Sequence, residues 1–435
     1  MERLSFHWTR QGGAVAIIAA LALPILIGFA GLALDLGHMY IEKTELQNAT
    51  DACALAASRE LTCDPAAGPC PSSYLEAAVN SGLTVARRNR IDFQGNQISN
   101  AQISASDIKF SLTIAPNSAY LDKDAANPAS KYVMCTAYQT GIIPWFMRIL
   151  GIGEQSVSAQ AVATLVAAQS NCAIPLGVCL ASGGSATNPY AGFSVGQWLT
   201  SRMSSSSTGS FDWIDYTPAS GGGASELADM LTGTGQCNLP PTGPATCSSG
   251  GAGTPGCVGA QGNKNALGKA WNTRFGLYKG SNTAANAPPD YTGYAYTPTS
   301  WPSRTDAFSN FQSARAAFTP FQGETAAGLP RNALNGYSTA LSTTLSTSGA
   351  DRRLAVAPIV DCSSWAGSSP QTVPILGYAC VLMLHPMSSD NGPSGTEEVF
   401  LEYRGRSTDP GSPCATSGMV GGPGSVGPLV PALVQ

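Results

Sequence analysis

The order of apolar and polar positions begins with a long apolar stretch near the N-terminus. Residues 14–34 form an uncharged run of 21 apolar residues. A helix of that length crosses the hydrocarbon core of a membrane, which is about 30 Å thick. The run contains Pro24, where we expect a kink or a local weakening that membrane helices tolerate. The pattern therefore predicts a single transmembrane helix.

A cleaved signal peptide is the alternative for this segment. The apolar core of a signal peptide is shorter, about 7–15 residues, and a small-residue cleavage site follows it. Gly31 and Ala33 provide a weak site of that kind. The length of the run favours the uncleaved helix.

The next segment, residues 35–61, lacks proline and repeats apolar or small residues mostly three or four positions apart. This spacing predicts that the helix continues outside the membrane as a long amphipathic helix, about 40 Å in length at 1.5 Å per residue. Its apolar face packs either on a partner helix or on the chain's own domain. The residues of this candidate partner-helix face are Leu36, Met39, Leu46, Ala49, Cys53 and Ala56.

Alternating segments further along predict an α+β fold. Strands are expected at residues 107–114, 132–138 and 154–168, with a short amphipathic helix at residues 144–152. From residue 171 onward, Gly/Ser/Pro-rich segments separate short elements, so we expect a loop-heavy region. Its predicted helices are residues 224–231, 265–275 and 304–318, and its predicted strands are residues 353–360, 373–384 and 397–403.

Charges on either side of the apolar run predict its orientation. Arg3 and Arg10 precede the run against one acid, Glu2, whereas Asp35 and further acids follow it. Positive residues are retained in the cytoplasm, so the bulk of the chain is expected outside it. The predicted parts are a cytoplasmic N-terminus (1–13), the transmembrane helix (14–34), the amphipathic helix (35–61), an α+β domain (62–170) and a Gly/Ser/Pro-rich extracytoplasmic domain (171–435).

Twelve cysteines in a Gly/Pro-rich chain indicate an oxidising compartment and a set of disulfides. No cysteines have the close spacing of a zinc site. The nearest pairs, Cys63/Cys70 and Cys172/Cys179, are plausible bridges, but spacing leaves the connectivity open. The candidate disulfide cysteines are Cys63, Cys70, Cys172, Cys179, Cys237, Cys247, Cys257, Cys362, Cys380 and Cys414.

Composition and motifs argue against several function classes. A net charge of −4 with 11% charged residues gives no basic surface for nucleic acid. The chain has three histidines and no catalytic, nucleotide or metal motif, so we predict no enzyme activity, cofactor, metal or small-molecule substrate. Two weaker alternatives are a hydrolase centred on His385 and a binding surface in the aromatic-rich loop at residues 278–301. The segment from Asp361 to Trp365 only partly matches a metal-dependent adhesion motif, and we reject that site.

The N-terminal segments RQGGAVAIIAALALP (residues 10–24), GLALDLGHMY (31–40) and LQNATDACALAASREL (46–61) carry a family resemblance. In order and spacing they resemble the N-terminal region of TadG-like proteins of the Flp (tight-adherence, Tad) pilus assembly system. Cys53 stands where that family usually has Ala, which leaves open whether it is oxidised with another cysteine.

The resemblance implies a pilin-like antiparallel sheet after the long helix. It also implies a location in the bacterial inner membrane, with the bulk of the chain periplasmic and other Tad/Flp assembly proteins as partners. Pilin precursors carry Glu at the fifth position of the processed helix, whereas Ile18 stands there when counted from Gly13. We therefore predict a non-enzymatic, membrane-anchored assembly component rather than a pilin subunit. The alternative is a secreted or surface-exposed adhesin.

Overall fold

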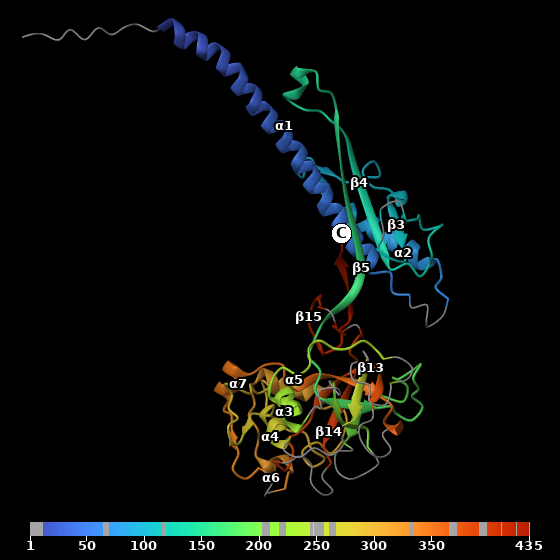
Figure 1. The fold of residues 1–435 in the computed structure, drawn as a ribbon, viewed down its shortest axis with the longest axis vertical. Coiled ribbons are helices and arrows are strands. Elements are labelled where there is room, and N and C mark those ends of the chain that lie inside the picture. The colour runs from blue at the N-terminus through green and yellow to red at the C-terminus, as the bar shows by residue number, and fades with distance from the viewer. Residues whose placement is uncertain are drawn as a thin grey trace, which may run out of the picture. The chain divides into compact units, whose positions relative to one another are not determined.

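The computed structural model divides into two compact units (Figure 1). Unit 1 comprises residues 1–166 and 431–435, and unit 2 comprises residues 167–430. The predicted cytoplasmic N-terminus lies almost wholly outside the described residues. The described residues are 12–63, 69–114, 116, 119–201, 209–216, 223–243, 247, 256–260, 267–330, 334–364, 372–390, 398–409, 411–422 and 424–434.

Unit 1 begins with helix α1 (Gly12–Ser58), which is continuous through Pro24. In the part of the chain that the structure describes, α1 is the one helix long and apolar enough to cross a membrane. Its first half exposes large side chains such as Ile17 and Phe29, at 64% and 67% of their surface. The second half is different, because Leu46 and its neighbours there are fully buried.

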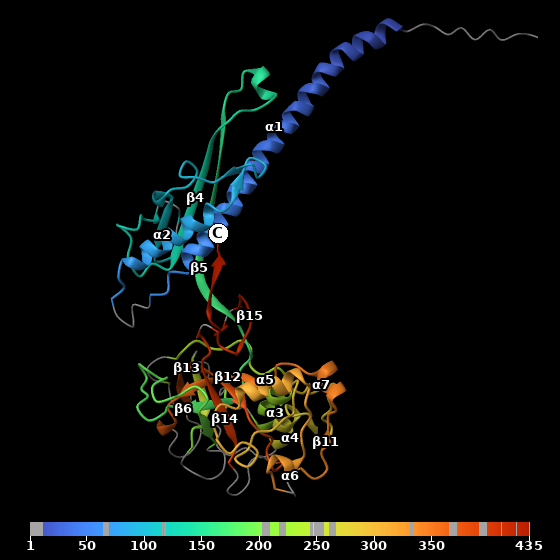
Figure 2. The same ribbon diagram turned by 180° about the vertical axis from the view of Figure 1, so that it is seen from behind.

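A second helix, α2 (Ser73–Ala86), packs beside the C-terminal half of α1, as Figures 1 and 2 both show. This helix was not predicted from the sequence. Gly82 allows the close approach, since a Cβ added there would lie 3.1 Å from the Cys53 sulfur. The buried residues of α2 recur with helical spacing: Leu75, Ala78, Val79, Gly82 and Ala86.

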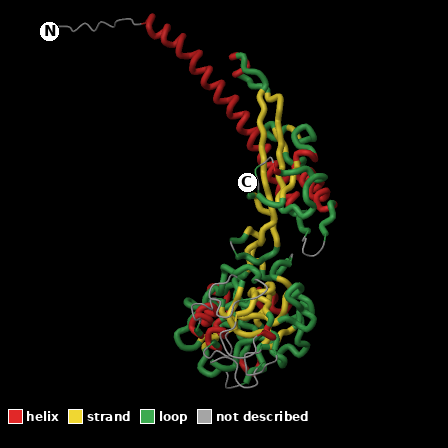
Figure 3. Tube along the Cα trace, turned by 45° about the vertical axis from the view of Figure 1, so that its right-hand side comes forward, coloured by secondary structure: helices red, strands yellow, loops and turns green. Residues whose placement is uncertain are grey.

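Antiparallel strands β3 (Ile108–Ser111), β4 (Tyr132–Ile142) and β5 (Gln155–Ser170) form the main sheet of unit 1. β4 and β5 make a long hairpin, drawn as paired yellow strands in Figure 3. The predicted helix at residues 144–152 is instead a short 3₁₀ turn (Met147–Leu150). β15 (Ala415–Val420) and β16 (Leu429–Leu433) also pair with β5, and a small hairpin joins β1 (Arg90–Ile91) to β2 (Asn96–Gln97).

Unit 2 is built on a seven-stranded sheet in the order β12-β6-β8-β9-β13-β14-β7. Since β12 also pairs with β13, five of these described strands close into a ring. The strands are β6 (Leu176–Cys179), β7 (Trp198–Thr200), β8 (Phe211–Asp215), β9 (Cys257–Ala260), β12 (Leu354–Val360), β13 (Thr372–Met383) and β14 (Phe400–Arg406).

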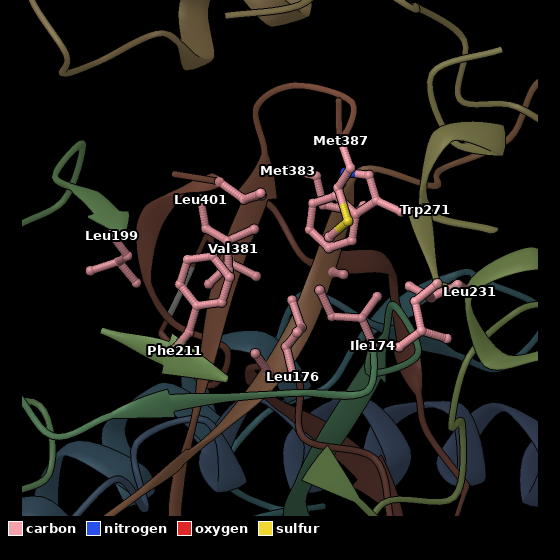
Figure 4. Packing of buried hydrophobic residues seen from close by; sticks show 14 of the residues in the cluster. Ile174, Leu176, Leu199, Phe211, Leu231, Trp271, Val381, Met383, Met387 and Leu401 are labelled. Carbon is pink, nitrogen blue, oxygen red and sulfur yellow. The ribbon is translucent and has the colours of Figure 1, made fainter. Parts of the chain in front are cut away.

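Short helices and a small hairpin complete unit 2. A core that includes Leu176, Phe211, Val381 and Leu401 joins four strands to the Trp271 side chain of α4 (Figure 4). The remaining elements are α3 (Ala224–Thr232), α4 (Gly268–Thr273), β10 (Leu277–Tyr278), α5 (Phe308–Ala316), α6 (Glu324–Ala327), β11 (Ser338–Thr339) and α7 (Ser342–Ser348).

All twelve cysteines are in disulfides, two in unit 1 and four in unit 2. The suggested Cys172/Cys179 bridge is wrong. Cys179 ends an extended strand, which rises about 3.3 Å per residue and so separates it from Cys172. The bridges are Cys53–Cys135, Cys63–Cys70, Cys172–Cys237, Cys179–Cys362, Cys247–Cys257 and Cys380–Cys414.

Candidate functional site

The most elaborate polar site of unit 1 lies where the turn between β4 and β5 meets α1. We call residues 143–154 the hairpin tip. The Asp35 carboxylate of α1 accepts hydrogen bonds from the backbone N–H groups of Trp145 (2.7 Å), Phe146 (2.9 Å) and Met147 (2.6 Å). Such N–H groups at the start of a helical turn otherwise lack partners. Asp35 therefore docks the hairpin tip onto α1.

The environment of Asp35 favours its charged form. Burial raises the pKa of the carboxyl, but the three backbone donors and nearby His38 lower it, and the resulting pKa lies below the usual value. The docking contact is thus a charge-assisted one over the whole neutral range.

One turn further along α1, the His38 ring stacks against two aromatic rings, whose own centroids lie 6.4 Å apart. Its ring centroid lies 5.2 Å from that of Phe93 and 4.7 Å from that of Trp145, and both pairs are stacked. His38 Nε2 lies 3.6 Å from a Glu42 carboxylate oxygen and 3.8 Å from one of Asp92. We refer to His38, Glu42 and Asp92 as the His38 cluster.

A strained loop carries Asp92 to this cluster. Asp92, Phe93 and Gln94 have φ values of 58°, 55° and 63°. This left-handed conformation costs a non-glycine residue on the order of 1–2 kcal/mol. Glu45 on α1 holds the loop, because its carboxylate accepts hydrogen bonds from Gln94 N (3.1 Å) and Gln94 Nε2 (2.9 Å).

The His38 cluster places the exposed Asp92 carboxylate close to the buried Glu42 and His38. Burial raises the pKa of Glu42, the Asp92 charge raises it further, and His38 opposes both. Among the described residues, these three are the group whose ligand atoms all lie within 4.8 Å of one another. Imidazole and carboxylate groups are ligands that bind Zn²⁺ in proteins. Sequence spacing indicated no metal site, because Asp92 joins His38 and Glu42 only through the fold.

The residues of the predicted partner-helix face do not form a free surface. Leu46, Ala49 and Cys53 are fully buried in the core of unit 1, against α2 and the sheet. Leu36 is 53% exposed, and Met39 and Ala56 are half-buried. The helix thus uses most of this face to cover its own domain.

His385 in unit 2 lacks the setting of a catalytic base. It is buried, Nδ1 donates to the Pro386 carbonyl (2.8 Å), and Nε2 accepts from Phe400 N–H (3.2 Å). Burial lowers the pKa of His385 to about 4. Both ring nitrogens are therefore occupied by backbone groups, and the ring serves packing.

The aromatic-rich loop at residues 278–301 also packs inward. Tyr296 is fully buried, and its ring lies 5.2 Å from that of Tyr294 and 5.6 Å from that of Trp301. Its hydroxyl donates to Asn310 (2.9 Å). These contacts place Tyr296 in the core of unit 2, with Tyr294 and Trp301 half-buried beside it.

The described residues of the rejected metal-dependent adhesion motif also contact other protein groups. The Asp361 side chain accepts hydrogen bonds from Ser363 N and Ser363 Oγ, while Cys362 is bonded to Cys179. Trp365 lies outside the described residues.

A buried arginine in unit 2 was not predicted. Arg353 is fully buried and donates from Nε to the Met383 carbonyl (2.9 Å) and from its terminal nitrogens to the carbonyls of Thr292 and Leu384 (3.2 Å each). Asp290 accepts from Arg353 N–H (2.9 Å). Burial lowers the pKa of Arg353 to about 10, so it stays charged at neutral pH. Its donors face backbone carbonyls, which indicates a structural role.

Comparison with known proteins gives a match at the N-terminal end. Residues 12–66 match the family described as "Putative Flp pilus-assembly TadE/G-like", which confirms the predicted TadG-like N-terminal region. Neither the curated proteins nor the solved structures contain a significant match to this chain. The matched residues include all of α1, and with it Asp35, His38 and Glu42.

Proposed function

We propose that this chain is a non-enzymatic component of Flp (Tad) pilus assembly, anchored in the bacterial inner membrane by α1 with its bulk in the periplasm. The observation that carries the proposal is the TadE/G-like match over residues 12–66, which coincides with the long apolar helix. Its partners are then other proteins of the pilus assembly system.

The distribution of charge and cysteine supports this topology. The residues before the apolar run carry Arg3 and Arg10, in keeping with a cytoplasmic N-terminus. Six disulfides distributed over both units suit the periplasm, since the cytoplasm keeps thiols reduced.

The proposed lack of catalysis rests on the placement of the titratable groups. His385 hydrogen-bonds to backbone through both nitrogens, and Arg353 donates to backbone carbonyls. An enzyme of this size would require a nucleophile, acid or base facing a cavity. His385, the catalytic centre considered from the sequence, is buried and held by backbone groups.

The test is in-cell crosslinking of a C-terminally tagged chain in cells that express the pilus, followed by membrane purification and mass spectrometry. Carbonate extraction and the apparent mass are measured on the same fractions. We expect a full-length, carbonate-resistant chain crosslinked to the Flp pilin or to its inner-membrane assembly proteins. An Ala16→Arg/Ala20→Arg double variant, which breaks the apolar run, provides the control that loses retention.

Two outcomes oppose the proposal. A shortened chain in the soluble or surface fraction, cut after α1, would replace it with the secreted adhesin. A retained full-length chain that crosslinks to no pilus protein would refute the assembly role while leaving the anchor intact.

A further inference from the structure

The hairpin tip exposes several large apolar side chains together. Ile149 is 83% exposed, Leu150 73% and Trp145 55%. The hairpin tip contains two charged residues, Arg148 and, at its C-terminal end, Glu154. Exposed apolar groups at this density mark an interaction surface rather than an ordinary loop in water.

This surface lies beside the apolar half of α1. Gly31 permits the contact, because a Cβ added there would lie 2.7 Å from the Phe146 Cβ. Next to this contact, a groove of about 360 Å³ separates the two elements. It is lined by Pro24 and Ile27 of α1 and by Ile149 of the hairpin tip. The 11 residue-to-residue steps from Pro24 to Asp35 span about 16 Å of helix, close to half the thickness of a membrane core.

We infer that the hairpin tip inserts into the bilayer leaflet from which α1 emerges, so that the chain contacts lipid through two elements. The inference rests on the proposed function, because it requires α1 to span the membrane. The ligand is the acyl region of that leaflet, and the groove between the hairpin tip and α1 accommodates acyl chains.

The backbone of the hairpin tip suits such an environment. An irregular turn enters a membrane only if its N–H groups have partners, since each unpaired group costs several kcal/mol there. Pro144 has no N–H, and Asp35 accepts from the next three residues. Three further N–H groups bond within the turn: Ile149 to Phe146, Gly151 to Arg148 and Ile152 to Met147.

The polar groups of the hairpin tip lie where a membrane surface would meet them. Trp145 stacks on His38 just beyond Asp35, and tryptophan favours the boundary between lipid and water. Arg148 is exposed, and its long side chain reaches lipid phosphates from a partly inserted backbone. Glu154 and Gln155 then return the chain to water.

Lipid is favoured over a protein partner by continuity with α1. Ile27, which lines the groove, is 56% exposed, and Leu26, the residue before it on α1, is 67% exposed. A membrane that surrounds these residues also reaches Ile149 and Leu150 beside them. The hairpin tip therefore needs no second protein to cover it.

The test uses the full chain with one added cysteine, labelled with the environment-sensitive fluorophore NBD and reconstituted into phosphatidylcholine/phosphatidylglycerol liposomes. The native cysteines are all in disulfides, so only the added thiol reacts. Ile149→Cys reports on the hairpin tip and Leu26→Cys on the span. Ile114→Cys is the matched control, because it is also an exposed aliphatic residue (54%) but follows β3 near the opposite end of β4.

Lipids brominated in their acyl chains quench NBD that enters the membrane core. We expect strong quenching at positions 26 and 149 and several-fold weaker quenching at position 114. Quenching at 26 but not at 149 overturns the inference while leaving the anchor of the proposed function intact. Blue-shifted but unquenched NBD at 149 indicates a second copy or a protein partner and also overturns it. Absence of quenching at position 26 contradicts both the membrane anchor of the proposed function and the insertion of the hairpin tip.

Discussion

At the scale of single residues, Asp35 has the largest influence on the geometry of unit 1. One carboxylate on α1 receives three consecutive N–H groups from a turn 110 to 112 residues further along the chain. This contact determines where the hairpin tip rests.

The Asp35→Ala substitution should release the hairpin tip. We expect amide hydrogen exchange at Trp145, Phe146 and Met147 to accelerate by about tenfold, as for loss of a helix-capping carboxylate. Mass spectrometry of peptides from the reconstituted chain measures the rates. Thr44→Ala, an exposed change on the same helix, is the control and should leave them unaltered. Unchanged exchange in Asp35→Ala would show that apolar contacts alone dock the turn.

His385 predicts a pH dependence of unit 2. Its folded pKa, about 4, lies below the unfolded value of about 6.5, so the unfolded chain binds the proton more readily. Stability from this group is complete above about pH 6.5 and is lost as the pH falls towards 4, by about 3 kcal/mol in all.

Urea unfolding at a series of pH values, followed by tryptophan fluorescence, checks this dependence. The His385→Gln variant should be less stable at neutral pH, because it disturbs the buried contacts to Pro386 and Phe400. It should also show a flatter profile between pH 6.5 and 4. An equally steep profile in the variant would assign the acid sensitivity to other groups.

Arg353 is the residue whose loss should destabilise unit 2 most. Arg353→Met removes the guanidinium, which leaves the carbonyls of Met383, Thr292 and Leu384 without their donor and takes a positive charge away from buried Asp290, a change that costs about 3–5 kcal/mol. Calorimetry of the detergent-solubilised chain should show a lower melting temperature for unit 2. Arg304→Met, at an exposed position, is the matched control. A similar small shift in both variants would contradict the structural role.

At the scale of elements, the Cys53–Cys135 disulfide joins α1 to β4 across a sequence separation of 82 residues, whereas Cys63–Cys70 closes a separation of 7. Loop-entropy arguments assign the longer loop about 2 kcal/mol more stabilisation. The double variant Cys53→Ala/Cys135→Ala should therefore unfold at clearly lower urea concentration than Cys63→Ala/Cys70→Ala. Equal midpoints would mean that helix packing, not the bridge, holds α1 on the sheet.

The elements also show where local pattern succeeds and where it fails. The predicted strand at residues 132–138 lies within β4, and the predicted helix at residues 224–231 within α3. In both, a side-chain period of two or about 3.6 identifies the element. The helical spacing of α2 was present but its small residues, Ala78 and Gly82, gave a weak apolar signal. Very short strands such as β1 and β2 exist only because a neighbour pairs with them.

At the scale of the whole molecule, the disulfide set ties correct folding to an oxidising compartment. The chain isolated from its native membrane, denatured without reduction, should gain no mass from a maleimide, and after reduction it should gain twelve labels. Mass spectrometry gives the count. A chain that lacks residues 1–34 but keeps the packed half of α1, expressed in a reducing cytoplasm, should yield poorly folded protein. Free thiols in the native preparation would contradict the assigned bridges.

The sequence by itself determined the long apolar helix, the TadG-like N-terminal region and most of the longer strands and helices. These depend on the length of an apolar run, on side-chain periodicity and on a local motif, all of which are readable along the chain. It also indicated that the cysteines form disulfides, because their number and setting suffice for that inference.

Only the tertiary structure decided which groups meet. Asp35 reaches the hairpin tip, His38 reaches Asp92, and Cys179 pairs with Cys362 rather than with Cys172. These partners lie between about 50 and 180 residues apart, and no local pattern encodes such a pairing. They form because burying the two cores aligns α1 with its hairpin and β6 with β12, and the polar groups brought together there must find partners.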